Sequence, residues 1–214
     1  MARYVGRALV TVLLGAMVCN GRSFTSSLSR RIGAPLVTCV GLLWGGSPSI
    51  AALTPFVDAN TGISFAFPAE QTGLVLSPKL VQTHASELFF KSETVKGLSL
   101  GITVDPVKIA SIREFADPPG LADKVVKVEK SKEGVFEASV LAAQESAKPV
   151  ADAVPAYEIE YKIDSSRGQN HYLVKATIID SKVYVFTVQC KEEMYAKLAP
   201  AAHVIIDSVK VTRI

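Results

Sequence analysis

The strongest constraint on the fold is a pair of strand-forming segments near the C-terminus, separated by the dipeptide Asp180-Ser181. Residues 171–179 and 182–189 are rich in valine, isoleucine, threonine and aromatic side chains, which favour β-strands. Two such segments with only two polar residues between them are typical of a tight β-hairpin. We therefore expect two neighbouring antiparallel strands in this part of the chain.

Shorter strand segments precede this hairpin. In residues 63–67, large apolar side chains alternate with small ones until Pro68, which is the period-two pattern of a strand followed by a residue that ends it. Further β-rich segments are residues 88–91, 98–104, 135–142 and 157–163. Strands joined as hairpins, with few helices, predict an α+β domain around a largely antiparallel sheet.

Two helices are expected among these strands. Asp117 is suited to cap a helix that begins at Pro118, because a proline at the first helical position loses no hydrogen bond. The apolar stripe of this helix would be Leu121, Val125 and Val126. A second helix is expected over residues 192–208, with acidic residues in its first turn and a kink or split at Pro200. Its apolar face would be Met194, Leu198, Ala201, Val204 and Ile205.

Charge is unevenly distributed along the chain. No acidic residue occurs before Asp58, whereas five arginines do: Arg3, Arg7, Arg22, Arg30 and Arg31. The chain has 23 Lys and Arg against 20 Asp and Glu, so the part that follows has 18 basic and 20 acidic residues and a net charge of −2. That part lacks the clustered basic surface of nucleic-acid-binding proteins, and we exclude that class.

The first 51 residues have the pattern of targeting signals in series. Basic residues precede a short apolar stretch, residues 8–19, as in a secretory signal, and residues 24–29 have the hydroxylated, acid-free composition of a plastid transit segment. Arg30 and Arg31 then precede a second apolar stretch, residues 32–44, and a small-residue cleavage site that would be cut after Ala51. We predict a tripartite presequence, residues 1–51, that ends in a twin-arginine signal for the thylakoid lumen, and a single domain over residues 52–214.

The alternative for this region is a pair of membrane anchors. A bilayer-spanning helix needs about 20 apolar residues, and the first stretch is too short. The second is interrupted by glycine and proline, namely Gly33, Pro35, Gly45, Gly46 and Pro48. We therefore favour removable signals.

From residue 52 onward the order of segments resembles the PsbP family. A polar turn with glycine precedes the alternating strand that ends at Pro68, and a Ser-Ile-x-x-Phe turn, residues 111–115, leads into the first helix. The most specific part is residues 171–189, with Ala176-Thr177, a turn before Lys182-Val183-Tyr184, and then Gln189. The helix that follows contains Tyr195.

The resemblance implies an α/β/α sandwich, a location in the thylakoid lumen, and peripheral attachment to photosystem II, without enzymatic activity. Two roles fit it, an extrinsic subunit of the oxygen-evolving complex and an assembly or repair factor that binds photosystem II intermediates. Plant members carry a long N-terminal docking arm, whereas here only residues 52–59 are expected before the first strand. This shortening favours the assembly factor and weighs against a role in calcium and chloride retention.

The same resemblance marks His171 and Glu192 as a candidate metal site, which would bind calcium or manganese weakly because two ligands do not close a coordination sphere. A lumenal divalent-metal module is thus the alternative function. The simpler account is that His171 is a half-exposed strand residue and Glu192 a favourable charge at a helix N-terminus.

The remaining chemistry-bearing residues have structural interpretations. Cys190, the one cysteine after the presequence, is expected to be a small core residue. His84 and His203 are expected to be structural. A solvated strand face is the simpler account of the acidic Asp152, Glu158, Glu160 and Asp164, and contact with cations is the alternative. A solvated helix face and docking onto acidic photosystem surfaces explain equally well the basic Lys124, Lys127, Lys130 and Lys132. The chain contains no nucleophile elbow, phosphate loop, zinc motif or dinucleotide fingerprint, so we do not expect an enzyme.

Overall fold

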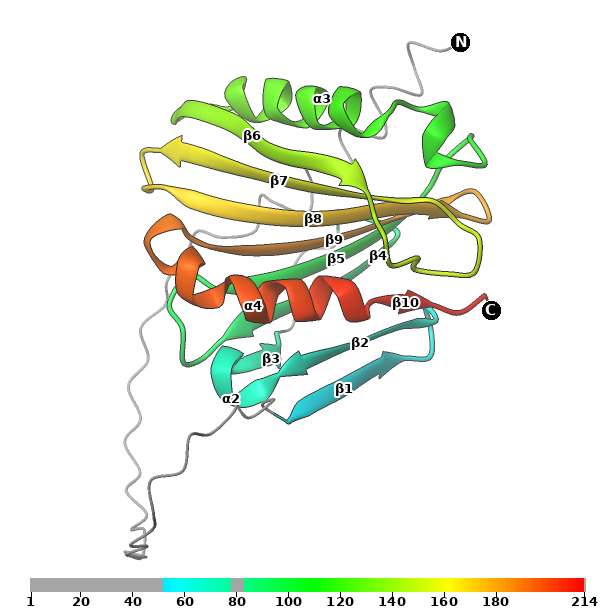
Figure 1. The fold of residues 1–214 in the computed structure, drawn as a ribbon, viewed down its shortest axis with the longest axis horizontal. Helices are drawn as coiled ribbons and strands as arrows, with labels where there is room; N and C mark the ends of the chain where they lie inside the picture. The colour runs from blue at the N-terminus through cyan, green and yellow to red at the C-terminus, as the bar shows by residue number, and fades with distance from the viewer. Residues whose placement is uncertain (1–51, 78–82, 214) are drawn as a thin grey trace, which may run out of the picture.

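The computed structural model describes residues 52–77 and 83–213, and the predicted presequence, residues 1–51, lies outside this range. A seven-stranded antiparallel sheet with the order β3-β4-β5-β9-β8-β7-β6 forms its centre (Figure 1). Its strands are β3 (Leu74–Leu76), β4 (Ser86–Ser92), β5 (Ser99–Pro106), β6 (Val135–Glu145), β7 (Ala156–Ser165), β8 (Asn170–Ile179) and β9 (Lys182–Lys191). The predicted antiparallel sheet is therefore confirmed.

The hairpin of β8 and β9 lies in the middle of this sheet, as expected from its apolar composition. Ile179 pairs with Lys182, and Asp180 and Ser181 between them both have left-handed backbone angles, with φ of 49° and 56°. Two consecutive positive φ values are the conformation of a type I′ turn, which matches the twist of the flanking strands. Neither residue is a glycine, so the turn is mildly strained.

This strain leads to a testable expectation. Replacing Ser181 by glycine should raise the free energy of unfolding by roughly 0.5–1 kcal/mol, because glycine adopts the left-handed region without a Cβ clash. Urea denaturation followed by circular dichroism measures the change. Ser166 is also exposed but has no positive φ, so Ser166→Gly serves as the control and should give no gain.

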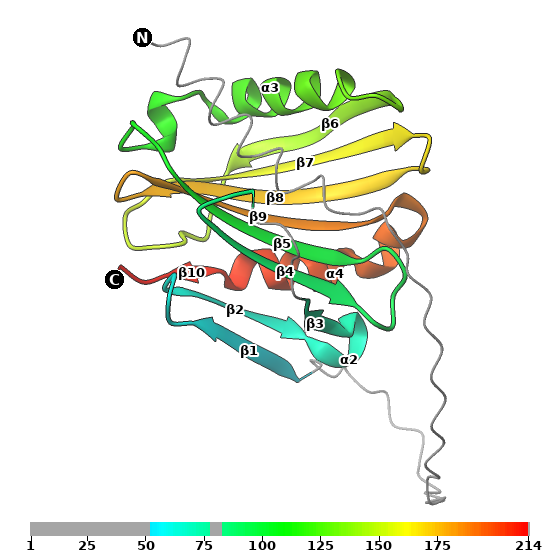
Figure 2. The ribbon, with the colours of Figure 1, turned by 180° about the vertical axis from the view of Figure 1, so that it is seen from behind.

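Helices cover both faces of the sheet (Figures 1 and 2). On one face α3 (Pro118–Lys130) packs on β6 and β7 around Leu121, Val125 and Tyr161. On the other, α4 (Glu192–Ser208) packs on β8 and β9 beside a three-stranded sheet of β1 (Leu53–Asp58), β2 (Ile63–Pro68) and β10 (Lys210–Val211). The chain is thus an α+β sandwich in which one outer layer includes a small sheet. No described helix is long and apolar enough to cross a membrane.

The first predicted helix begins where its capping residues place it. The Asp117 carboxylate accepts a hydrogen bond from the Gly120 N–H at 3.0 Å, and Pro118 is the first helical residue. A short 3-10 helix, Ile112–Glu114, precedes it, and a capping box between Ser111 and Glu114 caps its N-terminus. The local sequence therefore determines the start of α3 without help from distant contacts.

The second predicted helix has the expected ends, but Pro200 does not split it. Proline removes the hydrogen bond to the carbonyl of Ala196, and both residues lie on the exposed side of α4, where water can solvate that carbonyl. Val204, expected on the apolar face, is 37% exposed. The buried face of α4 is formed instead by Leu198, Ala201, Ala202, Ile205 and Ile206.

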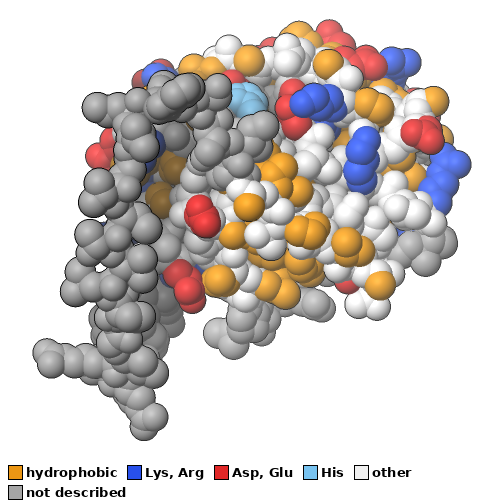
Figure 3. Space-filling view, turned by 60° about the horizontal axis from the view of Figure 1, so that its bottom comes forward, with side chains coloured by type: hydrophobic (Ala, Val, Ile, Leu, Met, Phe, Trp, Pro, Cys, Tyr) orange, Lys and Arg blue, Asp and Glu red, His pale blue; other side chains and the backbone are white. Residues whose placement is uncertain are grey.

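Residues 53–58 form β1 rather than an extension ahead of the first strand, which corrects the sequence-based expectation. β1 pairs with β2 from Leu53↔Pro68 to Asp58↔Ile63 and lies at the edge of its sheet, where a proline such as Pro55 is tolerated. Its inward residue Phe56 packs against Phe65 and Phe90. Leu53 and Val57 on β1 are 45% and 70% exposed. Figure 3 shows apolar side chains gathered on one face of the molecule. The short α2 (Ala69–Thr72), β3 and β10 were not predicted either.

The other end of the large sheet is irregular. In β6 the register with β7 shifts twice, between Val135 and Glu137 and between Val140 and Ala142. The extra residues, Phe136 and Leu141, have no partner on β7, and their side chains are 72% and 48% exposed. Each shift is a β-bulge that turns an apolar side chain outward.

Candidate functional site

The two predicted metal ligands are brought together at the start of α4. His171 lies at the second position of β8, and its Nδ1 is 2.7 Å from Oε2 of Glu192, the first residue of α4. His171 is only 2% exposed, so the expectation of a half-exposed strand residue is wrong. The first turn of α4 covers the imidazole, which the strand pattern alone did not show.

A second carboxylate reaches the same ring from the neighbouring strand. Oε1 of Glu160 on β7 lies 2.8 Å from Nε2 of His171. Glu160 was expected on a solvated acidic face, together with Glu158, but the antiparallel pairing of β7 with β8 turns both toward α4. Of the remaining two, Asp152 lies in a turn before β7, and Asp164 accepts a hydrogen bond from Gln169.

An aromatic ring completes the enclosure. The ring of Tyr195 on α4 stacks on the His171 imidazole with centroids 3.3 Å apart and planes 9° apart. Burial and a hydrogen bond to Glu160 raise the pKa of Tyr195 above its ordinary value. We call His171, Glu160, Glu192 and Tyr195 the carboxylate–histidine cluster.

The geometry of this cluster decides what it can bind. Each ring nitrogen of His171 lies within hydrogen-bond distance of a different carboxylate, so Glu160 and Glu192 together occupy both polar atoms of the imidazole. A metal ion would have to displace one of these bonds, since it binds an unprotonated nitrogen. Among the described residues there is no group of three or more His, Cys, Asp or Glu side chains arranged to hold a metal. Metal binding at His171 and Glu192 stays a prediction.

Cys190 lies directly across from His171 on β9 and is 2% exposed. Burial, and to a lesser extent the charge of Glu192, raise the pKa of its thiol to about 12. The thiolate is the reactive form of cysteine, so this side chain is inert at neutral pH and acts as a small core residue.

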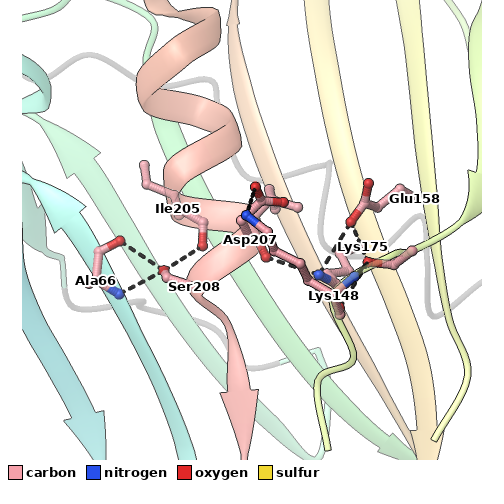
Figure 4. A network of polar contacts seen from close by, with 9 residues as sticks. Ala66, Lys148, Glu158, Lys175, Ile205, Asp207 and Ser208 are labelled. Carbon is pink, nitrogen blue, oxygen red and sulfur yellow. Dashed lines mark hydrogen bonds and ion pairs between the residues drawn. The ribbon is translucent and has the colours of Figure 1, made fainter.

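A second polar group lies further along the same face of β8. The Lys175 side chain is fully buried, and its Nζ is 3.2 Å from Oε1 of Glu158 and donates to the Ile206 carbonyl at 3.3 Å (Figure 4). Burial lowers the pKa of Lys175, and the neighbouring Glu158 opposes this. This lysine was not singled out from the sequence, although a charge inside an apolar strand is itself a signal of a buried pair.

Further contacts fix the C-terminal end of α4 to its surroundings (Figure 4). Lys148 Nζ lies 2.6 Å from Oδ2 of Asp207. The Ser208 hydroxyl accepts from the Ala66 N–H at 2.9 Å and lies within hydrogen-bond distance of two carbonyls, which ties α4 to β2. We call Lys175, Glu158, Lys148 and Asp207 the lysine network. The lysine network contacts the C-terminal end of α4, and the carboxylate–histidine cluster contacts its N-terminal end. Both include a residue of β8, namely Lys175 and His171.

The other singled-out residues lie apart from this site. His84 contacts Asp105 through Nδ1 and Glu87 at 3.4 Å, so it is structural, with one partner the sequence did not indicate. His203 is exposed on α4. The basic residues of α3 are exposed, and Lys132 beyond it pairs with Glu129.

With the fold and site established, comparison with known families identifies the chain. The PsbP family model matches residues 51–211.

The chain belongs to the PsbP family.

This finding confirms the resemblance drawn from residues 171–189 and from the order of the strands. A similar curated PsbP protein is PsbP domain-containing protein 2, chloroplastic, of Arabidopsis thaliana, which is 32% identical over 148 residues. PsbP-like protein 1, chloroplastic, of the same plant is 21% identical over 114 residues. The matches cover 69% and 53% of this chain. They span 60% and 48% of the relatives' own lengths, so the chain matches only part of each relative.

Among solved structures, the chain is similar to cyanobacterial PsbP (CyanoP) from Synechocystis sp. PCC 6803. The TM-score is 0.62 with 16% sequence identity, over 78% of this chain and 96% of the other. At this identity the likeness shows the PsbP fold and no more. It supports the α+β sandwich expected from the sequence.

Proposed function

We propose that this protein is a non-enzymatic PsbP-domain protein of the thylakoid lumen, which takes part in photosynthesis by docking peripherally on photosystem II. The observation that carries the proposal is the PsbP family match over residues 51–211. Its relatives in Arabidopsis thaliana are named as chloroplastic proteins, which supports a plastid location. The partners would be lumenal subunits of photosystem II or its assembly intermediates.

The predicted presequence supports the lumenal location. The family match begins at residue 51 and β1 begins at Leu53, directly after the proposed cut at Ala51. A signal must be separable from the folded domain, and a cut here would leave the paired strands of that domain intact. We therefore propose that residues 1–51 are a removable presequence and residues 52–214 the mature PsbP domain.

The same boundary favours one of the two roles. A cut after Ala51 would leave Ala52 alone ahead of β1, whose residues are paired with β2 and unavailable as an extended arm. A protein without such an arm must dock through the surface of its folded domain. Docking of this kind favours an assembly or repair factor, which binds and dissociates, over an extrinsic subunit that an additional segment holds in place.

Native separation of thylakoid complexes, with immunodetection of this protein, tests the proposal. We expect it to migrate with incomplete photosystem II complexes and to be released by a high-salt wash, because contacts between exposed charges are screened by salt. Migration with the complete oxygen-evolving complex would instead assign it the subunit role. Absence from every photosystem II species, or a location outside the lumen, would overturn the proposal.

The alternative is a lumenal module that binds a divalent metal without a stable photosystem partner. The observation in its favour is that the two predicted ligands lie together, with His171 Nδ1 2.7 Å from Glu192 Oε2. Calorimetric titration with calcium, manganese and zinc tests it. Saturable heat that disappears in the His171→Ala, Glu192→Gln double variant would support this alternative, and no heat would eliminate it.

A further inference from the structure

A cleft of about 670 Å³ opens at one end of the large sheet, and two of the residues that line it, Asn170 and Lys191, directly precede His171 and Glu192 in the sequence. It lies where the β4–β5 loop, the end of α3, the β7–β8 hairpin and the end of β9 meet. Its volume is within the range of small-molecule sites, roughly 300–1,000 Å³. The apolar part of the wall includes Leu98, Val135 and Tyr172.

Basic side chains predominate around this cleft. Five line it, namely Lys91, Lys96, Lys132, Arg167 and Lys191, against two acidic ones, Glu129 and Glu133. This excess of three positive charges contrasts with the net charge of −2 that the sequence assigns to the part of the chain after the presequence. A concave wall of one charge raises the local concentration of ions of the opposite sign.

The acidic residues do not cancel this field. Glu129 is 2% exposed and lies 2.8 Å from Nζ of Lys132, so the pair contributes no net charge. Glu133 is exposed to solvent. Lys91 and Lys96 are also exposed, and neither forms an ion pair within the part of the chain that the structure describes. Both are free to turn toward a bound anion.

Lys191 is the fixed cation of the group. Its Nζ donates to the Arg167 carbonyl at 2.8 Å, and its stem lies against Gly97, where an added Cβ would meet Lys191 Cγ at 3.1 Å. Gly168, on the other side, would place a Cβ 3.5 Å from the same Nζ. Both glycines have positive φ, 85° and 89°, so the two loops reach Lys191 in a conformation that other residues rarely adopt. An ammonium has three N–H donors, and only one of these is engaged in this contact.

We propose that this cleft binds a small molecule carrying two or more oxyanion groups, either phosphates or carboxylates. Lys191 holds the ligand as a preorganised donor, and Lys91 and Lys96 close on it from the rim. Fixing a cation in advance lowers the entropic cost of binding, which distinguishes this site from a scatter of surface lysines. The inference does not depend on the role in photosystem II.

Calorimetric titration of the full chain at low ionic strength tests the site, with pyrophosphate as the phosphate probe and citrate as the carboxylate probe. We expect saturable binding of at least one of them. The Lys191→Met variant keeps the aliphatic stem but loses the charge, and should weaken binding about tenfold. Lys96→Met provides a second variant at an exposed position and should weaken it by a smaller factor.

Lys182→Met is the matched control, because Lys182 is an exposed lysine at the opposite end of the same strand. It should leave the affinity unchanged. Circular dichroism verifies that each variant is folded. If Lys191→Met does not fold, the loss of affinity in Lys96→Met tests the proposal instead. The proposal is overturned by absence of saturable binding of both probes, or by equal weakening in Lys182→Met.

Discussion

Replacing Glu158 by leucine is expected to lower the free energy of unfolding by about 3 kcal/mol or more. The substitution leaves the fully buried Lys175 ammonium with the Ile206 carbonyl as its remaining contact, and a buried charge that loses its partner is costly. Urea denaturation of the full chain at pH 7 measures the loss. Removing both charges, in the Glu158→Leu, Lys175→Met double variant, should restore most of the stability, because no unpaired charge then remains.

The pH dependence of the Glu158→Leu variant provides an independent control. Burial lowers the pKa of Lys175, and Glu158 raises it, so the pKa in the variant falls further below the ordinary 10.5. Between the folded-state pKa and 10.5 the unfolded chain binds a proton that the folded one has lost, so stability rises with pH in that window. The deficit of the variant should therefore shrink at alkaline pH. A deficit of constant size would show that lost packing, rather than the unpaired charge, is the cause.

Replacing His171 by alanine should cost about 3 kcal/mol. The imidazole is 2% exposed, and its loss leaves Glu160 and Glu192 without their shared hydrogen-bond partner and Tyr195 without its stacked ring. Thermal and urea denaturation measure the effect. His203→Ala changes an exposed histidine on α4, the helix that covers His171, and should alter stability by less than about 0.5 kcal/mol.

His171→Gln separates packing from hydrogen bonding, since glutamine fills part of the volume but its single amide nitrogen cannot stand in for both ring nitrogens. We expect an intermediate loss. If His171→Ala and His203→Ala had equal effects, the carboxylate–histidine cluster would have no structural role, and the metal alternative would gain weight.

Much of the fold could be predicted from the sequence because its signals are local. The two β-branched-rich segments on either side of Asp180-Ser181 define the central hairpin, and Asp117 with Pro118 defines the start of α3. β1 was missed because Pro55 interrupts a six-residue segment, and only its pairing with β2 stabilises it as a strand. Helix packing likewise overrode the breaking tendency of Pro200.

The site was predictable only in part, because it depends on contacts between distant segments. His171 and Glu192, which the family resemblance marks together, lie 2.7 Å apart between Nδ1 and Oε2, and their binding of a metal stays a prediction. Glu160 and Tyr195 were not assigned to it, since their positions depend on the register of β7 and on how α4 lies across the sheet. Lys175 was not predicted as part of a buried pair for the same reason, because its partner Glu158 lies on the neighbouring strand, β7.

The two bulges of β6 have a consequence for self-association. An unpaired strand margin is a template on which a second molecule can add by backbone hydrogen bonds, and such addition leads to fibres. At one margin of the sheet, Phe136 and Leu141 interrupt the regular spacing of donors and acceptors that an incoming strand would need. At the other margin β3 has three residues, too few for stable pairing. Both borders of the seven-stranded sheet thus discourage the addition of a strand from a second molecule to that sheet.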